Sequence, residues 1–330
     1  MGGCGEGTAS PPSRGETLSP GIVSNRERKR QQKNYTGGND ATGGPLPHDD
    51  EESERPDGDG MDDLIRSHRR WLKDSIRKEV DWSATGQSLG LPPPPAWKPV
   101  PPNARTVALP GPDRFDTVCT AGLLRVLRSR RSIRRYADTP LSLEELAFLL
   151  WATQGVTERH GDEATFRPVP SAGARHAFET YLYCRRVKTL EEGIYRYLPL
   201  EHRLLFEFTE RGLAARLSEA CFGQRFVGQG AVTFFWSVIP SRMEWRYGPA
   251  AHRVLPMDVG HVCQNLYLSS EAIGAGACAV AAYDQEALDA LLRLDGEEEF
   301  VLYLAPVGKH GAPAQLEGSP GISPLRAKRQ

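Results

Sequence analysis

The stretch DVGHVCQNLYLSSEAIGAGACAV occupies residues 258–280 and decides the fold class through the order of its elements. We expect Asp258 to cap a long helix that ends at Gly274. The glycine-rich run 274–279 would then follow a helix and precede a strand. A dinucleotide-binding Rossmann unit needs the reverse order, with glycines that leave a strand and open a helix. The sequence therefore argues against a Rossmann fold.

On both sides of this stretch, short runs rich in β-branched and aromatic residues predict strands. Three of them, separated by turn-like segments, favour an antiparallel meander. A further helix, capped by Asp284, is expected between the last two strands. The predicted strands are 177–184, 193–198, 203–208, 231–239, 277–282 and 299–308. Because strands and helices do not alternate strictly, the compact part of the chain is predicted to be α+β.

Three helices are expected within residues 120–220. Residues 120–129 have a helical pattern, and another short helix is expected near 210–220. Between them, Ser142 and Glu145 have the spacing of a capping box ahead of LAFLLWATQ. We expect that helix to end at Gly155 in a left-handed conformation, which glycine adopts readily.

The densest local charge is RSRRSIRRY, residues 128–136. In an extended conformation, alternation would place Arg130, Ser132 and Arg134 on one face. Two guanidinium groups with a hydroxyl between them suit a terminal phosphate. The same pattern is also compatible with a solvated basic edge.

Residues 1–60 are rich in Gly, Pro, Ser and charged residues, and this composition predicts a disordered tail. The basic run NRERKRQQK at 25–33 is more typical of a solvated tail than of a nucleic-acid site. Met61 is a candidate for the physiological start. Residues 61–114 are expected to form an amphipathic helix, over 62–80 and packed on the main domain, followed by a stiff proline-rich connector at 91–102.

The composition limits the possible partners. Forty-one basic residues against 42 acidic ones give a net charge of −1, so no global charge attracts nucleic acid. No apolar run approaches the roughly 20 residues that span a bilayer. The six cysteines and eight histidines lack metal-ligand spacing. We therefore expect a soluble cytoplasmic protein with reduced thiols, no metal, and neither a membrane nor a nucleic-acid partner.

Four motifs together resemble the nitroreductase superfamily. In order along the chain they are RRSIRRY at 130–136, PSAGARHAFETYLY at 170–183, the 258–280 stretch and LAPVGK at 304–309. The PSAGAR segment and the Arg-Tyr-Gly before the 258–280 helix are similar to the branch that contains azoline dehydrogenases. The resemblance implies an α+β fold with a central, mainly antiparallel sheet flanked by helices, and a homodimer with FMN at the subunit interface. The flavin domain would cover 115–312, followed by a flexible tail at 313–330.

The resemblance also implies site residues by motif position. The ribityl phosphate would be held by Arg130, Arg131, Ser132 and Arg134, with Lys309 returning toward it from the last strand. Pro170, Ser171, Ala172 and Gly173 would line the flavin ring. Gly274, Ala275 and Gly276 would approach the ring near its N5 atom, although family members often have Leu at the position of Ala275. Small residues let backbone amides approach a flat ring, but an ordinary turn and a helix stop would also explain the last two motifs.

The commonest family chemistry would take hydride from NADH or NADPH and deliver two electrons to a small oxidised acceptor. Azoline dehydrogenation of ribosomal peptides is a second possibility. Its Lys-Tyr pair would correspond to Arg246 and Tyr247 here, and arginine cannot serve as the general base because it stays protonated. A packed turn at these two residues, and a flavin-binding subunit without turnover, are also compatible with the sequence. The sequence does not identify the substrate or the preferred nicotinamide.

Overall fold

The computed structural model describes residues 58–119, 121–161 and 164–310. The expectations for residues 1–57 and 311–330, including the two tails, lie outside this range.

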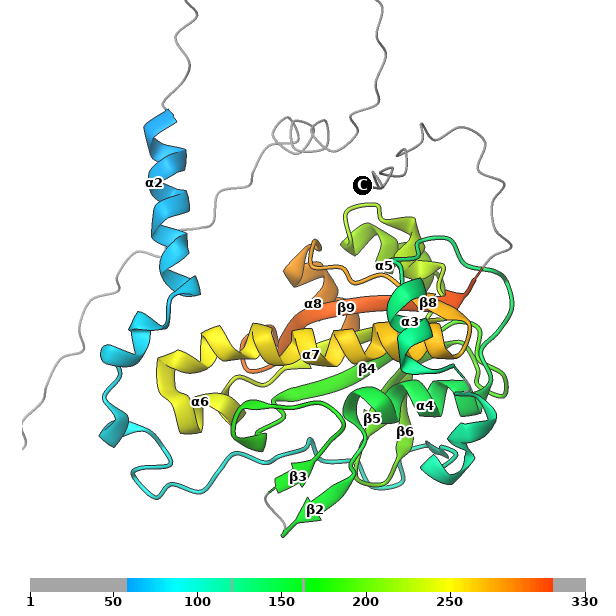
Figure 1. Cartoon of the computed structure of the whole chain (residues 1–330), viewed down its shortest axis with the longest axis horizontal. Helices are drawn as coiled ribbons and strands as arrows, with labels where there is room; N and C mark the ends of the chain where they lie inside the picture. The colour runs from blue at the N-terminus through cyan, green and yellow to red at the C-terminus, as the bar shows by residue number, and fades with distance from the viewer. Residues whose placement is uncertain (1–57, 120, 162–163, 311–330) are drawn as a thin grey trace, which may run out of the picture. The chain divides into compact units, whose positions relative to one another are not determined.

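A seven-stranded sheet organises the chain, with the strand order β1-β6-β5-β4-β7-β9-β8 (Figure 1). All neighbouring strands pair antiparallel. Its strands are β1 (Thr106–Ala108), β4 (Phe178–Cys184), β5 (Gly193–Leu198), β6 (Arg203–Phe208), β7 (Val232–Val238), β8 (Ala275–Ala277) and β9 (Phe300–Lys309). A separate hairpin pairs β2 (Glu158–His160) with β3 (Ala164–Phe166). The predicted α+β fold with a central antiparallel sheet is confirmed.

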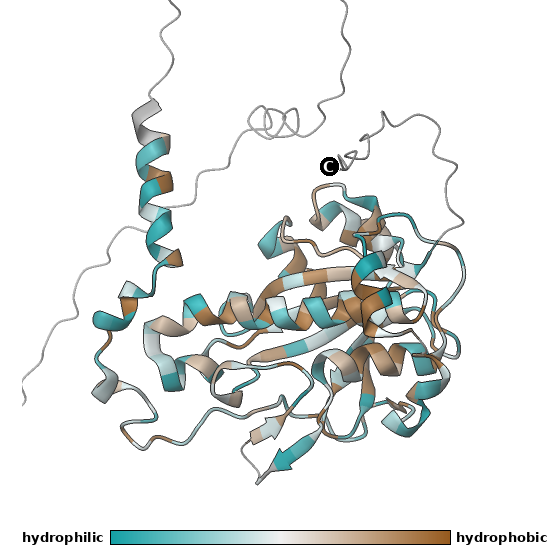
Figure 2. Ribbon diagram, in the orientation of Figure 1, coloured by the Kyte–Doolittle hydropathy of each residue, from teal (hydrophilic) through white to brown (hydrophobic). Residues whose placement is uncertain are grey.

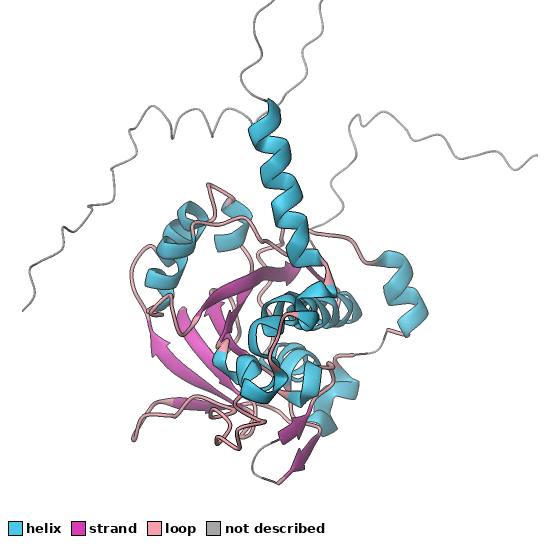
Figure 3. Ribbon diagram, turned by 90° about the vertical axis from the view of Figure 1, so that its left-hand side faces the viewer, coloured by secondary structure: helices cyan, strands magenta, loops and turns pink. Residues whose placement is uncertain are grey.

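Both faces of the sheet are covered by helices (Figure 3). The helices are α2 (Gly58–His68), α3 (Leu123–Ser129), α4 (Leu143–Gln154), α5 (Leu213–Ala220), α6 (Ser241–Tyr247), α7 (Ala251–Ala272) and α8 (Gln285–Leu292). Alternate residues of β7 enter two separate cores. Phe234 and Trp236 pack with residues of α4 and α7, whereas Phe235 packs with residues of α5 and α8. This double burial explains the uninterrupted apolar run that predicted a buried strand.

The ends of two helices differ from the prediction. The capping box of α4 is confirmed, because the Ser142 hydroxyl accepts from Glu145 N and the Glu145 carboxylate accepts from Ser142 N. Gly155, however, has φ of −62° and is not left-handed. A Cβ there would lie 2.4 Å from Trp151 Cδ1 and 2.7 Å from its Cα, so close packing is what requires glycine.

Helix α7 begins earlier than predicted. It starts at Ala251, so Asp258 lies within the helix and does not cap it. The Asp258 side chain is instead used by a distant loop, described below. At the other end of the helix, Gly274 is left-handed, with φ of +67°, and β8 follows at once. Gly276 is therefore part of the strand itself. The strand predicted at 277–282 is largely wrong, because β8 ends at Ala277 and only Val280 beyond it forms an isolated bridge, with Leu304.

The amino-terminal segment does not form one helix over 62–80. Helix α2 gives way to 3₁₀ turns at Arg69–Leu72 and Asp74–Lys78, separated by the extended residue Lys73. Apolar and polar residues alternate along α2 (Figure 2), yet Leu64 and Ile65 are 52% and 44% exposed. The expected packing on the main domain is therefore not seen for α2 within the described chain, whereas Leu72 and Val80, later in the predicted segment, do lie beside Arg253 and Gly248. Further on, β1 pairs with β6, so the sheet already includes residues upstream of 115.

We predict opposite effects for two glycine substitutions. Gly155→Ala forces a Cβ against the Trp151 backbone and should lower the free energy of unfolding by about 1–3 kcal/mol. Gly260→Ala, in α7 with nothing within 4 Å of the added Cβ, should raise it by up to about 1 kcal/mol through helix propensity. Urea unfolding of both variants checks this, and equal effects would contradict the packing argument.

Candidate functional site

The basic segment at 128–136 lies beside the glycine-rich strand. Ser132 forms a parallel bridge with Ala277 of β8, and Ile133 N donates to the Ala277 carbonyl at 2.9 Å. The Ile133 side chain lies directly over Gly276, where a Cβ would be 2.4 Å from Ile133 Cγ1. Glycine is therefore needed at 276 for the two segments to meet. Two motifs that are more than 140 residues apart in the chain are thus brought together.

Tyr267 of α7 connects this segment to the helix. Its hydroxyl accepts from Ala279 N at 2.7 Å and lies 3.1 Å from Ser132 Oγ, to which it can donate. The Arg130 guanidinium lies over its ring, with Cζ 5.2 Å from the ring centroid. Tyr267 was not among the residues predicted for the site. The available signal was a tyrosine within the 258–280 motif, on the helix that leads into the glycines.

The other arginines of the segment diverge. Arg134 lies over the ring of Phe226, 5.7 Å from its centroid, whereas Arg131 donates to the carbonyls of Arg128 and Arg130. No carboxylate in the described part of the chain pairs with Arg130, Arg131 or Arg134. The segment thus gathers positive charge that the described protein does not neutralise. Such a surface suits an anion.

Lys309 lies at the far end of β9, opposite Ala275. Its ammonium group donates to the Ile273 carbonyl at 2.7 Å and forms an ion pair with Glu145. These contacts fix the turn at Gly274, where α7 meets β8. Its charge is already shared with a carboxylate, unlike the charges at 130–134.

The loop PSAG, residues 170–173, forms a second cluster around Asp258. One carboxylate oxygen of Asp258 accepts from Ser171 Oγ at 2.7 Å and from Ala172 N at 3.0 Å. The Ser171 hydroxyl in turn accepts from His176 N at 3.0 Å. Asp258 was expected to cap a helix, and its actual role is to shape this loop.

Two buried groups of this second cluster have shifted pKa values. Burial raises the pKa of the Asp258 carboxyl, against the two hydrogen bonds that it accepts. Burial, and then the charge of Arg167, lower the pKa of His176 to about 3. The ring is therefore neutral, and as the Nε2–H tautomer it donates to the Thr165 carbonyl, 3.0 Å away.

Arg246 and Tyr247 lie against the same loop. Gly173 is left-handed, with φ of +59°, and a Cβ there would be 2.9 Å from the Tyr247 hydroxyl and 3.0 Å from Arg246 Nε. The Arg246 guanidinium lies 5.6 Å from the Tyr247 ring centroid. The structure therefore brings the predicted ring-lining loop and the predicted catalytic pair together.

The predicted residues thus form two clusters along α7. The first surrounds Ser132 and Tyr267, and the second surrounds Ser171 and Asp258. Tyr267 lies nine positions after Asp258 in the helix, which is about 13 Å at 1.5 Å per residue. One helix therefore sets the distance between the two clusters.

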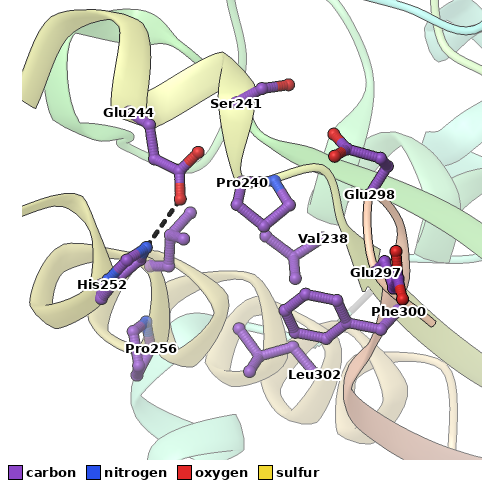
Figure 4. Close-up of a pocket in the computed structure, with 11 residues that line it drawn as sticks. Val238, Pro240, Ser241, Glu244, His252, Pro256, Glu297, Glu298, Phe300 and Leu302 are labelled. Carbon is purple, nitrogen blue, oxygen red and sulfur yellow. Dashed lines mark hydrogen bonds and ion pairs between the residues drawn. The ribbon is translucent and has the colours of Figure 1, made fainter. Parts of the chain in front are cut away.

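A cavity of about 420 Å³ lies on another side of α6 (Figure 4). Its walls are mainly apolar. On one side, the Glu244 carboxylate accepts a hydrogen bond from His252 Nε2, with 2.6 Å between Nε2 and Oε1. It is lined by Val238, Pro240, Ser241, Glu244, His252, Leu255, Pro256, Glu297, Glu298, Phe300 and Leu302. None of the predicted site residues lines it. Helix α6 contributes residues to the wall of this cavity and also carries Arg246 and Tyr247, but neither of these two residues lines the cavity.

Two further features are absent from the residues that the structure describes. No helix there is long and apolar enough to cross a membrane. No group of three or more His, Cys, Asp or Glu side chains there has an arrangement that could hold a metal ion.

Comparisons with known proteins assign this framework to a family. Residues 127–309 match the model of the nitroreductase family, which is more than half of the chain. The protein MJ1384 of Methanocaldococcus jannaschii, whose name describes it as a nitroreductase, is 35% identical over 184 residues, covering 56% of this chain and 89% of that protein. The trifolitoxin-processing protein TfxB of Rhizobium leguminosarum bv. trifolii is 26% identical over 178 residues, covering 52% of this chain and 48% of TfxB.

A solved structure supports the same fold. A protein from Ralstonia eutropha JMP134, also named as a nitroreductase, superposes with a TM-score of 0.52 at 27% sequence identity. The match covers 68% of this chain and 96% of that one.

We predict that Asp258→Ala destabilises the protein more than Asp258→Asn does. Alanine leaves the Ser171 hydroxyl and Ala172 N–H without their acceptor, which should cost about 1–3 kcal/mol. Asparagine can keep an oxygen at the same place. Urea unfolding of both variants measures the difference, and equal losses would contradict the assigned hydrogen bonds.

The same variants predict a pH dependence. Because folding raises the pKa of Asp258, the native state holds its proton more tightly than the unfolded chain. The stability that this group contributes is therefore fully present below its ordinary pKa of 3.8, and it is lost as the pH rises through the raised pKa of the native state. Asp258→Asn should lack this slope when its unfolding is measured at a series of pH values.

Proposed function

Because the chain belongs to the nitroreductase family of oxidoreductases, we propose that it binds FMN and transfers two electrons between NADH or NADPH, or an organic donor, and a small oxidised acceptor. The observation that carries the proposal is the unneutralised basic cluster at Arg130, Ser132 and Arg134, set beside the glycine-rich strand. Bound FMN would supply the hydride chemistry, and the protein would supply binding and orientation.

The first cluster fits the ribityl phosphate. Arg130 and Arg134 are each supported by an aromatic ring, which orients the guanidinium groups without neutralising their charge. The Ser132 hydroxyl lies between them in sequence and is held by Tyr267. Guanidinium groups and hydroxyls donate hydrogen bonds to phosphate oxygens. Arg131 would add charge, and Lys309 would hold the adjoining turn.

The second cluster fits the flat flavin ring. Pro170 to Gly173 form a short loop whose backbone is fixed by Asp258, and its small side chains would let a ring approach that backbone. The space beside Gly173 that a side chain would fill is taken by Arg246 and Tyr247. Gly274, Ala275 and Gly276 would contribute backbone at the other edge of the ring. The chain would thus exclude water by packing small residues on the ring.

We further propose a homodimer with the flavin at its interface. The single chain leaves an apolar surface on α3, beside the basic segment, where Leu123, Leu124 and Leu127 are 65%, 61% and 53% exposed. Burial of these leucines against a second copy would stabilise the dimer, because exposed apolar patches mark interaction sites.

Azoline oxidation is a second candidate function. It is supported by the placement of Arg246 and Tyr247 against Gly173, and by the similarity to TfxB, a toxin-processing protein. Arg246 stays protonated and cannot be the base, so any proton transfer falls to Tyr247. A flavin-binding subunit without turnover is the third candidate.

FMN binding tests the phosphate assignment. Replacement of both Ser132 and Arg134 by alanine removes a hydroxyl and a cation from the phosphate, and should weaken FMN binding by about 100-fold, from roughly 1.5–3 kcal/mol per charged hydrogen bond. Arg135→Ala, in the same segment but on the alternate face, is the matched control. Titration of the apoprotein by flavin fluorescence measures both. Full FMN affinity in the double variant would defeat the assignment.

Anaerobic addition of NADH or NADPH to the FMN-loaded protein tests the reaction. Loss of the flavin absorbance near 450 nm, roughly where any oxidised flavin absorbs, is expected if the protein is a reductase. A flavin that is reduced only by an azoline-containing peptide would favour the second candidate. A flavin that neither the nicotinamide nor the azoline peptide reduces would favour the third candidate, a flavin-binding subunit without turnover.

A further inference from the structure

The segment of residues 72–95, here called the strap, runs along the outside of the corner that carries Arg246 and Tyr247. It lies upstream of residues 127–309, which match the family model. In Figure 1 it is the cyan chain that passes α6. Its structure is mostly 3₁₀ turns and proline-rich extended chain.

The contacts between the strap and the α6–α7 corner run antiparallel. As the strap residue number rises from 72 to 95, the number of its partner falls from 253 to 242. The successive contacts are Leu72 O with Arg253 Nε at 3.1 Å, Val80 beside Gly248, Gln87 N with Trp245 O at 2.9 Å, Leu91 O with Trp245 Nε1 at 2.9 Å, and Pro95 O with Arg242 Nε at 2.8 Å. The strap therefore holds the whole corner and not a single point of it.

Trp245 is the central contact. A Cβ on Gly86 would lie 2.6 Å from Trp245 Cδ1, so the strap backbone rests directly against the indole. The Arg175 guanidinium lies over the same indole, 4.8 Å from its centroid, and Arg175 Nε donates to the Arg242 carbonyl. Because Arg175 follows the PSAG loop in the chain, Trp245 joins the strap to that loop.

The strap is anchored firmly beyond residue 95. Arg242, which is 2% exposed, bridges Pro95 O and the Glu179 carboxylate, with 2.7 Å between Arg242 Nη2 and Glu179 Oε1. Lys98 N also donates to Glu179, and its ammonium group pairs with the buried Glu299. Breaking a buried ion pair by removing one partner is strongly destabilising, so the downstream end of the strap is fixed.

We propose that the strap is a positioning element of the reaction site, which keeps Arg246 and Tyr247 against Gly173 through Trp245. This inference rests on the proposed function of these residues. The strap would act indirectly, through Trp245. The upstream extension would then be part of the machinery in this chain, although it lies outside the family domain.

Gly86→Ala tests the coupling, because the added Cβ must displace the Trp245 indole. Gly260→Ala, where the added Cβ meets nothing, is the matched control. Trp245→Phe, which removes the N–H bonded to Leu91 O but keeps an aromatic ring, covers the case in which Gly86→Ala does not fold. All three are made in the full chain.

Hydrogen–deuterium exchange without FMN is the first measurement. Gly86→Ala and Trp245→Phe should accelerate exchange in residues 241–250 and also in 170–176, whereas Gly260→Ala should leave both segments unchanged. Faster exchange confined to the strap would overturn the proposal. Because no flavin is needed, this result stands whether or not the proposed function is correct.

Turnover of the FMN-loaded variants is the second measurement, with NADH and 1,4-benzoquinone as probes. Displacement of the PSAG loop, which would line the flavin ring in either candidate reaction, should lower kcat roughly tenfold or more while FMN affinity changes less than about twofold. An unchanged kcat with accelerated exchange at 170–176 would show that movement of the corner does not affect turnover. It would overturn the proposal that the strap positions groups for the reaction. Absence of bound FMN in every variant, the natural chain included, would instead refute the proposed function.

Discussion

The packing of helix α7 on one face of the sheet is the constraint on which both clusters depend. Its apolar side chains are buried with those of α4 and of β4, β7 and β9, which fixes its rotation. That rotation points the Asp258 carboxylate at the PSAG loop and the Tyr267 hydroxyl at Ser132. Because the helix is rigid, the distance between the two clusters is set by its rise per residue. Neither cluster could move far without the other.

Features of the fold that depend on local chemistry were predictable from the sequence. The capping box at Ser142 and Glu145 and the Asp284 cap each involve residues three apart, and both form as expected. The β-rich runs became antiparallel neighbours at the predicted places. One failure has a tertiary cause. Asp258 has the chemistry of a cap, but the helix extends past it and a loop about 87 residues away takes its carboxylate. The helix expected over 62–80 instead ends at His68 and is followed by 3₁₀ turns on either side of Lys73.

For the candidate site, the motifs showed which segments matter but not how their side chains are used. Alternation placed Arg130, Ser132 and Arg134 on one face, yet their partners differ. Arg130 lies over the Tyr267 ring, Ser132 lies beside the Tyr267 hydroxyl, and Arg134 lies over the Phe226 ring. Tyr267 and Trp245 were missed because an aromatic residue in a helix does not by itself indicate a hydrogen-bonding role, even within a motif that points to the site. Their roles arise only where segments distant in the chain meet.

The pairing of β1 with β6 has a consequence for where the domain can be cut. Residues 106–108 cover the outer hydrogen-bonding groups of β6, although they lie some twenty residues before the start of the family match. A chain trimmed to residues 127–309 would leave β6 as a bare edge strand. Unpaired edges are templates for pairing with other chains, so such a fragment should be prone to aggregate even with its core complete. The boundary of family similarity and the boundary of a self-sufficient sheet do not coincide in this protein.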